Sequence, residues 1–174
     1  MARFDATSAE CLVFTYKDGL LAAVAHDLEI RVTKFVIDID EQTHAVDARF
    51  DATSLRVVGA MRDDIESPDT LTAANKREIE ANIVREVVHS EQYPEVRFVS
   101  SAVQESPKEY RIKGVLSLHG HRRQITIPVR RAGAAYVAEA RIHQPDFGIR
   151  PYSALFGTLR VQPNVTVRVS VPAP

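Results

Sequence analysis

The sequence is poor in the features that define several protein classes. Its single cysteine, Cys11, excludes an internal disulfide and a metal site built from several cysteines. A lone thiol beside an apolar run is more often buried filler than a nucleophile. No apolar run approaches the ~20 residues of a membrane-spanning helix. With 7 Gly and 9 Pro in 174 residues, the composition indicates neither a fibrous repeat nor a disordered chain.

An excess of charge of one sign is also missing. The 22 Lys and Arg residues are offset by 23 Asp and Glu residues, which leaves a formal net charge of -1. No broad basic field is therefore present to attract nucleic acid or an anionic membrane. We expect no nucleic-acid partner and no stable membrane insertion.

The first residues lack the charged, apolar and small-residue order of a secretory signal. If Met1 is the true start, the expected location is the cytoplasm. A chain numbered after removal of a signal peptide would look the same and would be periplasmic. The length of 174 residues fits one domain with a full core, so we expect a single domain over residues 1–174.

Alternation of apolar and polar residues, which is typical of strands with one buried face, dominates the chain. Between residues 46 and 53, for example, Val46, Ala48 and Phe50 share one face and Asp47 and Arg49 the other. The segment 11–16 is expected to form a hairpin with the apolar run 20–25. Similar patterns recur at 28–39, 96–102, 110–118, 125–129, 136–142, 159–161 and 165–171.

The alternation changes parity between residues 28 and 39. The apolar positions are Leu28, Ile30 and Val32 before Thr33, but Phe35, Ile37 and Ile39 after it. One inserted residue, a β-bulge, would keep both sets on one face and bend the strand. Strongly curved strands are typical of barrels.

A segment of helical period interrupts the strands. Between about Ala73 and His89, apolar residues recur every four positions at Ile79, Ile83 and Val87. Thr72 is the expected N-cap, and Pro94 disfavours helical geometry at Tyr93. We predict one amphipathic helix that packs on or plugs the sheet.

The predicted fold is therefore mainly β: about eight antiparallel strands with one inserted helix, for which closure into a barrel is the simplest outcome. Such an interior is either filled by side chains or holds one small ligand. The pattern alone separates neither these two cases nor a barrel from a sandwich.

Histidines offer the strongest hints of chemistry. His26 and Asp27 are adjacent, but neighbouring residues of a strand point to opposite faces, which favours a structural role. His119 and His121 share a face at a spacing that can bind a metal, yet no third ligand is identifiable nearby. No phosphate loop and no nucleophile elbow occurs. We expect no catalytic residue, no metal and no cofactor.

Five motifs resemble the bacterial YceI-like family in order and spacing. They are Ser54-Leu55, Arg62-Asp63, residues 93–100 (YPEVRFVS), residues 114–120 (GVLSLHG) and residues 146–149 (DFGI). The resemblance implies a lipocalin-like antiparallel barrel with an inserted helix. It further implies a lipid-binding module, since members of the family hold a long polyisoprenoid, and it brings no catalytic residues.

An apolar chain gains about 0.8 kcal/mol for each methylene buried, so a dry interior needs no catalytic group to bind it. The expected ligand is an isoprenoid or another lipid-like molecule in a carrier or sequestering role. The alternatives are a filled barrel acting as a structural or interaction protein, with a homodimer possible, and a histidine-based enzyme. The lining candidates are the inward apolar positions Phe14, Leu28, Ile30, Phe50, Phe98, Leu116, Ile125, Ile127, Phe147 and Phe156.

Overall fold

The computed structural model describes residues 1–19 and 26–174, which are mainly antiparallel strands. Twelve of the described strands form one sheet and three short ones form another. The large sheet contains β1 (Ala2–Asp5), β2 (Glu10–Thr15), β4 (Asp27–Val32), β5 (Phe35–Ile39), β6 (Val46–Asp51), β7 (Leu55–Arg62), β8 (Ile65–Ser67), β9 (Glu95–Glu105), β10 (Tyr110–Leu118), β11 (His121–Ala132), β12 (Ala135–His143) and β15 (Asn164–Pro172). The small sheet contains β3 (Lys17–Asp18), β13 (Ser153–Ala154) and β14 (Leu159–Val161).

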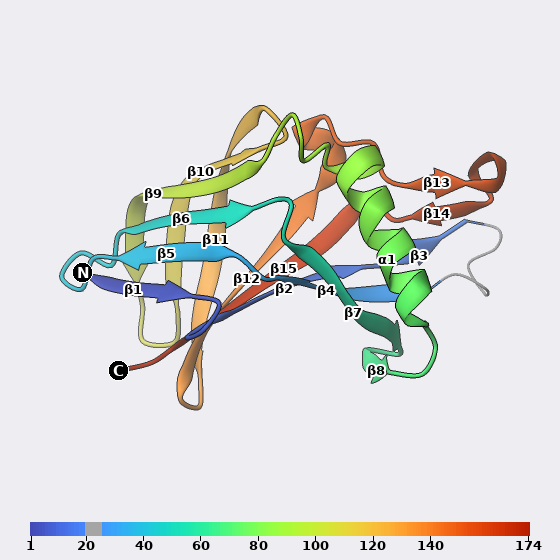
Figure 1. Cartoon of the computed structure of the whole chain (residues 1–174). Helices are drawn as coiled ribbons and strands as arrows, with labels where there is room; N and C mark the ends of the chain where they lie inside the picture. The colour runs from blue at the N-terminus through green and yellow to red at the C-terminus, as the bar shows by residue number, and fades with distance from the viewer. Residues whose placement is uncertain (20–25) are drawn as a thin grey trace.

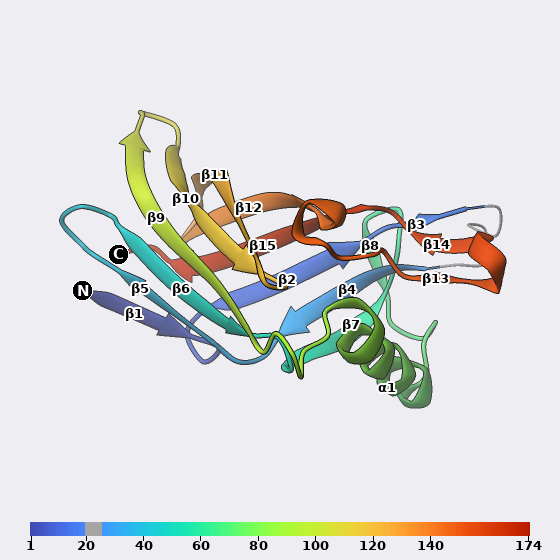
Figure 2. The same ribbon diagram turned by 90° about the horizontal axis from the view of Figure 1, so that it is seen from above.

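The large sheet curls because three of its long strands are bent. Its strand order is β1-β5-β6-β9-β10-β11-β12-β15-β2-β4-β7-β8. In the chain, β1 runs into β2, β4 into β5 and β6 into β7, with breaks only at residues 6–9, 33–34 and 52–54. The two halves of each bent strand thus lie toward opposite ends of the strand order. The chain itself therefore draws the ends of the sheet together into a barrel-like shape (Figures 1 and 2).

The barrel-like antiparallel class predicted from the sequence is confirmed, but the expected strand number differs. When each bent pair is taken as one strand, the sheet has eight long strands and the short β8. The bend predicted from the change of parity lies at Thr33 and Lys34, as a break between β4 and β5 rather than a one-residue bulge. The expected hairpin with the run 20–25 lies outside the described residues.

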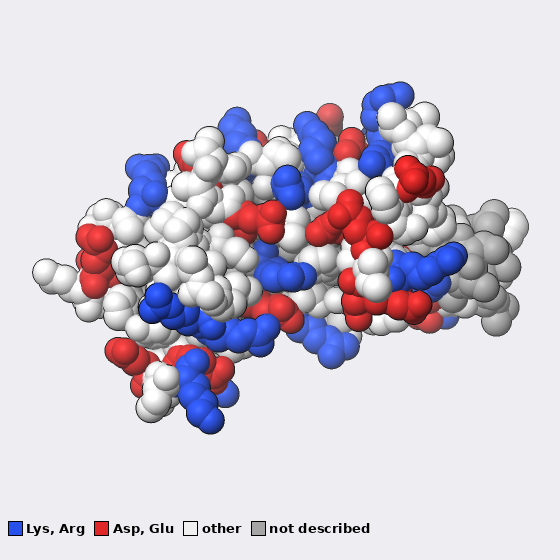
Figure 3. Space-filling view, turned by 90° about the horizontal axis from the view of Figure 1, so that it is seen from below, with Lys and Arg blue, Asp and Glu red and all other residues white. Residues whose placement is uncertain are grey.

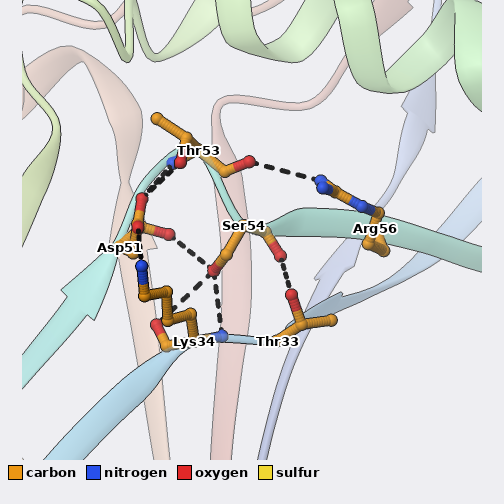
Figure 4. Close-up of polar contacts among 6 residues, drawn as sticks. All are labelled: Thr33, Lys34, Asp51, Thr53, Ser54 and Arg56. Atoms are coloured by element: carbon orange, nitrogen blue, oxygen red, sulfur yellow. Dashed lines mark hydrogen bonds and ion pairs between the residues drawn. The ribbon is translucent and has the colours of Figure 1, made fainter.

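Hydrogen bonds between neighbouring chain segments hold the bends of β4/β5 and β6/β7 side by side (Figure 4). The Ser54 hydroxyl accepts the backbone N–H of Lys34 at 3.1 Å and donates to the Asp51 carbonyl at 2.7 Å. The Thr33 N–H and hydroxyl both donate to the Ser54 carbonyl, at 3.0 and 2.9 Å. The backbone N–H and C=O groups that lose their strand partners at the bend thereby find other hydrogen-bond partners, so few hydrogen bonds are lost there.

The inserted helix α1 (Ala73–Asn82) continues into a π-helical turn, η1 (Ile83–Val87). Its N-terminus is a capping box, as the Thr72 hydroxyl accepts the Asn75 N–H and the Asn75 side chain accepts the Thr72 N–H, both at 3.1 Å. The predicted helix and its N-cap are therefore confirmed. In Figure 1 the helix lies across one end of the curled sheet, beside β7.

A β-bulge anchors this helix. Glu29 pairs with Gly59 and Ile30 with Val57, so Val58 is an extra residue in β7. The Val57 N–H donates to the Glu80 carboxylate of α1 at 2.9 Å. The bulge frees a backbone donor, and the helix supplies its acceptor.

The last strand of the large sheet, β15, lies between β12 and β2, and pairs Thr166 with Phe14. Two 3-10 turns, η2 (Gln144–Phe147) and η3 (Leu155–Gly157), flank the β13 strand. The η2 turn ends at Gly148, whose φ of 67° places it in the left-handed region that glycine adopts without strain.

Candidate functional site

A cavity of about 960 Å³ lies inside the curled sheet. Every second residue of its strands faces this space, as alternation requires. Along β15 these are Val165, Val167, Val169 and Val171, and on β12 they are Ala138, Ala140 and Ile142. The interior thus contains a largely apolar cavity, bounded by side chains that also belong to the hydrophobic core.

The helix closes part of the wall with its apolar stripe. Ile79 of α1, together with Ile83 and Val87 of η1, lines the cavity. None of the residues of α1 and η1 is fully buried, because this stripe faces the open space instead of a packed layer. The side of the helix that bears Glu80 is fixed to β7, so the stripe is held in place.

Most of the predicted lining residues come together around this cavity. They originate from β4, β6, β9, β10 and β11, strands that are far apart in the sequence but share the interior face. The predicted residues found in the wall are Leu28, Ile30, Phe50, Phe98, Leu116, Ile125 and Ile127.

Phe14 does not line the cavity, contrary to the expectation that it faces the interior. On β2 the lining residues are Cys11, Val13 and Thr15, so Phe14 falls on the outer face by alternation. Its ring is nonetheless buried, and the Arg168 guanidinium lies 4.6 Å from the ring centroid. The aromatic surface is covered by a cation–π contact rather than by the interior.

Phe147 and Phe156 also lie outside the cavity wall, for opposite reasons. Phe147, in the η2 turn, is 3% exposed and packs into the hydrophobic core. Phe156 is 109% exposed in the η3 turn between β13 and β14. Both residues were expected to face inward, and only Phe147 does.

A second bulge explains why Ala102 is exposed, although it shares the parity of Phe98 in the sequence. Lys113 pairs with Ala102 and Gly114 with Ser100, which makes Ser101 an extra residue of β9. The parity of β9 therefore changes after Phe98, and Val103 lines the cavity in place of Ala102. Four alanines, Ala48, Ala52, Ala138 and Ala140, are in the wall, where their small side chains leave room.

Sequence reasoning missed the polar residues at the two ends of the cavity. At one end, the rings of His44, Tyr110 and Tyr136 form edge-to-face contacts, with centroids 5.2 and 6.0 Å apart. At the other end lie Lys17, His26, Tyr152 and Arg160. The alternation of β10 and β12 places Tyr110 and Tyr136 on the inner face, so the signal was present for those two.

Two ionisable groups of the wall, Cys11 and Tyr110, are held in their neutral forms. Burial, with a smaller contribution from Glu10, raises the pKa of the Cys11 thiol to about 12. Burial and the nearby Glu105 carboxylate raise the pKa of Tyr110, whose hydroxyl donates to Glu105 at 3.3 Å. A neutral thiol and a neutral phenol suit an apolar interior, and the thiol is unsuited to nucleophilic attack.

Asp27 and His119, considered from the sequence as possible catalytic or metal-binding residues, have structural partners. The Asp27 carboxylate accepts the backbone N–H of Lys17 at 2.7 Å. The His119 Nδ1–H donates to the Phe147 carbonyl at 3.1 Å, and its Nε2 accepts from His89 Nδ1 at 3.0 Å. Within residues 1–19 and 26–174, no group of three or more His, Cys, Asp or Glu side chains is arranged to hold a metal ion.

The neutral form of His119 should make the stability of the protein depend on pH. Burial, the largest cause, and the neighbouring His89 and His121 lower the pKa of His119 in the folded state. The unfolded chain takes up this proton at about pH 6.5, so acid favours unfolding and stability is lost as the pH falls below that value. Urea unfolding between about pH 7.5 and pH 5 should show this loss, with a smaller slope in His119→Gln.

The matched control is His26→Gln, because His26 is exposed. It should keep the pH dependence of the unchanged protein. Equal slopes for the unchanged protein and for His119→Gln would contradict the role given to His119.

Comparisons with known proteins agree with this architecture. A model of the YceI-like domain matches residues 5–173, and no curated protein matches the chain. The crystal structure of Burkholderia cenocepacia BcnA is similar with a TM-score of 0.69 and 16% identity, over 98% of this chain and 99% of that one. Among the described helices, none is long and apolar enough to cross a membrane.

Two further solved structures share the fold. A Campylobacter jejuni YCEI protein has a TM-score of 0.60 at 12% identity, over 83% of this chain and 82% of that one. A polyisoprenoid-binding domain from Saccharophagus degradans, implicated in plant cell wall breakdown, has a TM-score of 0.57 at 11% identity, over 95% and 94%. The match of the domain model over nearly the whole chain shows that this protein belongs to the YceI-like family.

Proposed function

We propose that the protein binds a long apolar molecule, an isoprenoid or a similar lipid chain, inside the curled sheet and acts as its carrier or sequestering protein. The observation that supports this most directly is the apolar cavity of about 960 Å³. Ligand cavities in proteins commonly measure about 300–1,000 Å³, so this one is near the upper end. The polyisoprenoid-binding domain from Saccharophagus degradans, which has a similar fold, supports the same class of ligand.

The side chains of the cavity wall favour an apolar ligand over a polar one. Its middle consists of aliphatic and aromatic side chains such as Val167, Ile127 and Phe98. A polar molecule would lose its hydrogen bonds to water there without replacement. An apolar chain gains about 0.8 kcal/mol for each methylene that it buries, so several methylenes suffice for useful affinity.

Binding rather than catalysis fits the ionisable groups described above. The Cys11 thiol is protonated at neutral pH. Both ring nitrogens of His119 form hydrogen bonds, one with the Phe147 carbonyl and the other with the His89 ring. On the face seen in Figure 3, the basic and acidic side chains of the described residues are interspersed rather than gathered by sign. The unfilled interior also makes the filled-barrel alternative the weaker one.

Organic extraction of the purified protein, followed by mass spectrometry, tests the proposal. We expect a co-purified chain-like molecule, released by solvent and absent from an unrelated protein purified in parallel. After extraction, the protein should take up a prenyl alcohol or a fluorescent fatty acid with one site per chain. Protein that is repeatedly empty and takes up neither probe would rule out the carrier function.

A further inference from the structure

Phe156 stands out among the apolar residues that the structure describes. It lies in the η3 turn that connects β13 and β14, and its side chain is 109% exposed. The other large exposed apolar residues of the described part are less open, with Met1 at 76%, Ile65 at 71% and Val99 at 41%. A phenyl ring left wholly in water gains nothing for the stability of the fold.

The backbone at this position is also unfavourable for a phenylalanine. Its φ of 57° and ψ of 35° lie in the left-handed region, where bulky residues are rare. The following Gly157 has a φ of 82°, so the turn contains two consecutive left-handed residues. Backbone strain of this kind is concentrated at sites of function.

The turn is placed at one end of the cavity. Figures 1 and 2 show the small sheet of β3, β13 and β14 extending beyond the large sheet, on the side opposite the two chain termini. Leu159, Arg160 and Val161 of β14 line the cavity, as does Lys17 of β3, which pairs with Val161. The exposed ring therefore stands three residues from the wall of the proposed ligand site.

The charges of the hairpin suit an anionic surface. Residues 148–162 contain Arg150 and Arg160 but no Asp or Glu. Arg160 lies 3.8 Å from Asp18, and both side chains are about half exposed, so this pair neutralises the arginine only weakly. An aromatic tip flanked by arginines is the composition of a segment that lies in the interface of a bilayer.

The small size of the tip favours a membrane over a protein partner. A specific protein interface needs roughly 1,000 Å² of matched surface, whereas one ring and two arginines can enter a lipid headgroup layer by themselves. We propose that the β13–β14 hairpin inserts the Phe156 ring into the headgroup layer of a bilayer containing anionic lipids, and turns the adjacent end of the cavity toward that membrane. This is a peripheral contact made by one side chain and a local pair of arginines, so it requires neither a broad basic field nor a stable insertion of the chain. The direction given to the cavity rests on the proposed function, while the insertion of the ring does not.

Vesicle flotation tests the insertion. The unchanged protein should bind vesicles of phosphatidylcholine mixed with phosphatidylglycerol, and Phe156→Ser should reduce its partition coefficient by roughly tenfold or more, the loss expected for one buried phenyl ring. The matched control is Ile65→Ser, because Ile65 is also exposed but lies at the edge strand β8. The control should bind as the unchanged protein does.

Two results would overturn the inference: no vesicle binding by the unchanged protein, or an equal loss in both serine variants. Uptake of a fluorescent fatty acid in vesicle-free solution separates this inference from the proposed function. Normal uptake with no effect of Phe156→Ser on vesicle binding defeats only the inference. A Phe156-dependent interaction with vesicles and no uptake by any variant defeats only the carrier function.

A tryptophan probe gives a second measurement that does not depend on a loss of binding. The chain contains no Trp, so Phe156→Trp introduces the only one. Its emission should shift to shorter wavelength when mixed vesicles are added, and brominated lipids should quench it. Ile65→Trp should show neither effect, and a Phe156→Trp emission spectrum that vesicles leave unchanged would contradict the insertion.

Discussion

Ala140→Phe should lower the affinity for an apolar chain by about tenfold or more. Ala140 lies on β12 opposite Val167 of β15, and both residues line the cavity. The added ring would occupy space that the ligand needs. If it displaces two methylenes at about 0.8 kcal/mol each, the loss already exceeds a factor of ten. Displacement of a bound fluorescent fatty acid measures the change.

This substitution should leave the fold intact, because the ring enters an existing space rather than a packed core. Ala102→Phe is the matched control, since Ala102 is an exposed alanine on the outer face of β9. It should bind the probe as the unchanged protein does. A folded Ala140→Phe protein with unchanged affinity would show that the ligand does not occupy this part of the cavity.

Gly114→Ala should reduce the free energy of unfolding by about 3 kcal/mol. A Cβ atom added to Gly114 would collide with the Val99 carbonyl oxygen and would lie 2.5 Å from the Phe98 ring. The ring could turn into the cavity, but the carbonyl belongs to the neighbouring strand and moves only with β9. The midpoint of urea unfolding measures the loss.

Gly59→Ala is the control for this experiment. Gly59 is also in the large sheet, but the nearest atom to its added Cβ is a Glu66 carboxylate oxygen at 3.9 Å, an ordinary contact. Alanine there should change the stability by less than about 1 kcal/mol. If Gly114→Ala were as stable as the control, the contact of β9 and β10 at the bulge would be looser than the structure indicates.

Much of the fold could be predicted from the sequence because alternation and helical period are local signals. The segments around Phe50, Leu116 and Val167 alternate clearly, and each forms a strand. Thr72 followed by helical spacing marked the beginning of α1. β1 and β8 were missed because they are short edge strands, which hydrogen bonds to one neighbour define rather than their own pattern. β7 was missed because the bulge at Val58 interrupts its alternation.

The site was harder to predict than the fold. Alternation along a strand identifies which residues face inward only until a bulge shifts the pattern by one residue. The bulge at Ser101 arises from the pairing of β9 with β10, which the sequence of β9 alone does not reveal. Phe14 and Phe156 were predicted to face the interior because aromatic residues usually do. In the structure, the Arg168 guanidinium covers the Phe14 ring on the outer face, and Phe156 is exposed. Whether the interior contains a cavity depends on how the total volume of the inward side chains compares with the space that the curled sheet encloses. No local sequence pattern contains this information.

The position of β15 between β12 and β2 has a consequence for synthesis. Residues 164–172 occupy a place in the middle of the strand order, beside β2. The two strands are about 150 residues apart in the sequence, as are Tyr16 and Thr166, whose hydroxyls form a hydrogen bond, so β2 is synthesised long before β15. Until these residues leave the ribosome, β2 and β12 each have an open hydrogen-bonding edge. The nascent chain must therefore be kept from aggregating through those edges, and the sheet can close only after residues 164–172 have been translated.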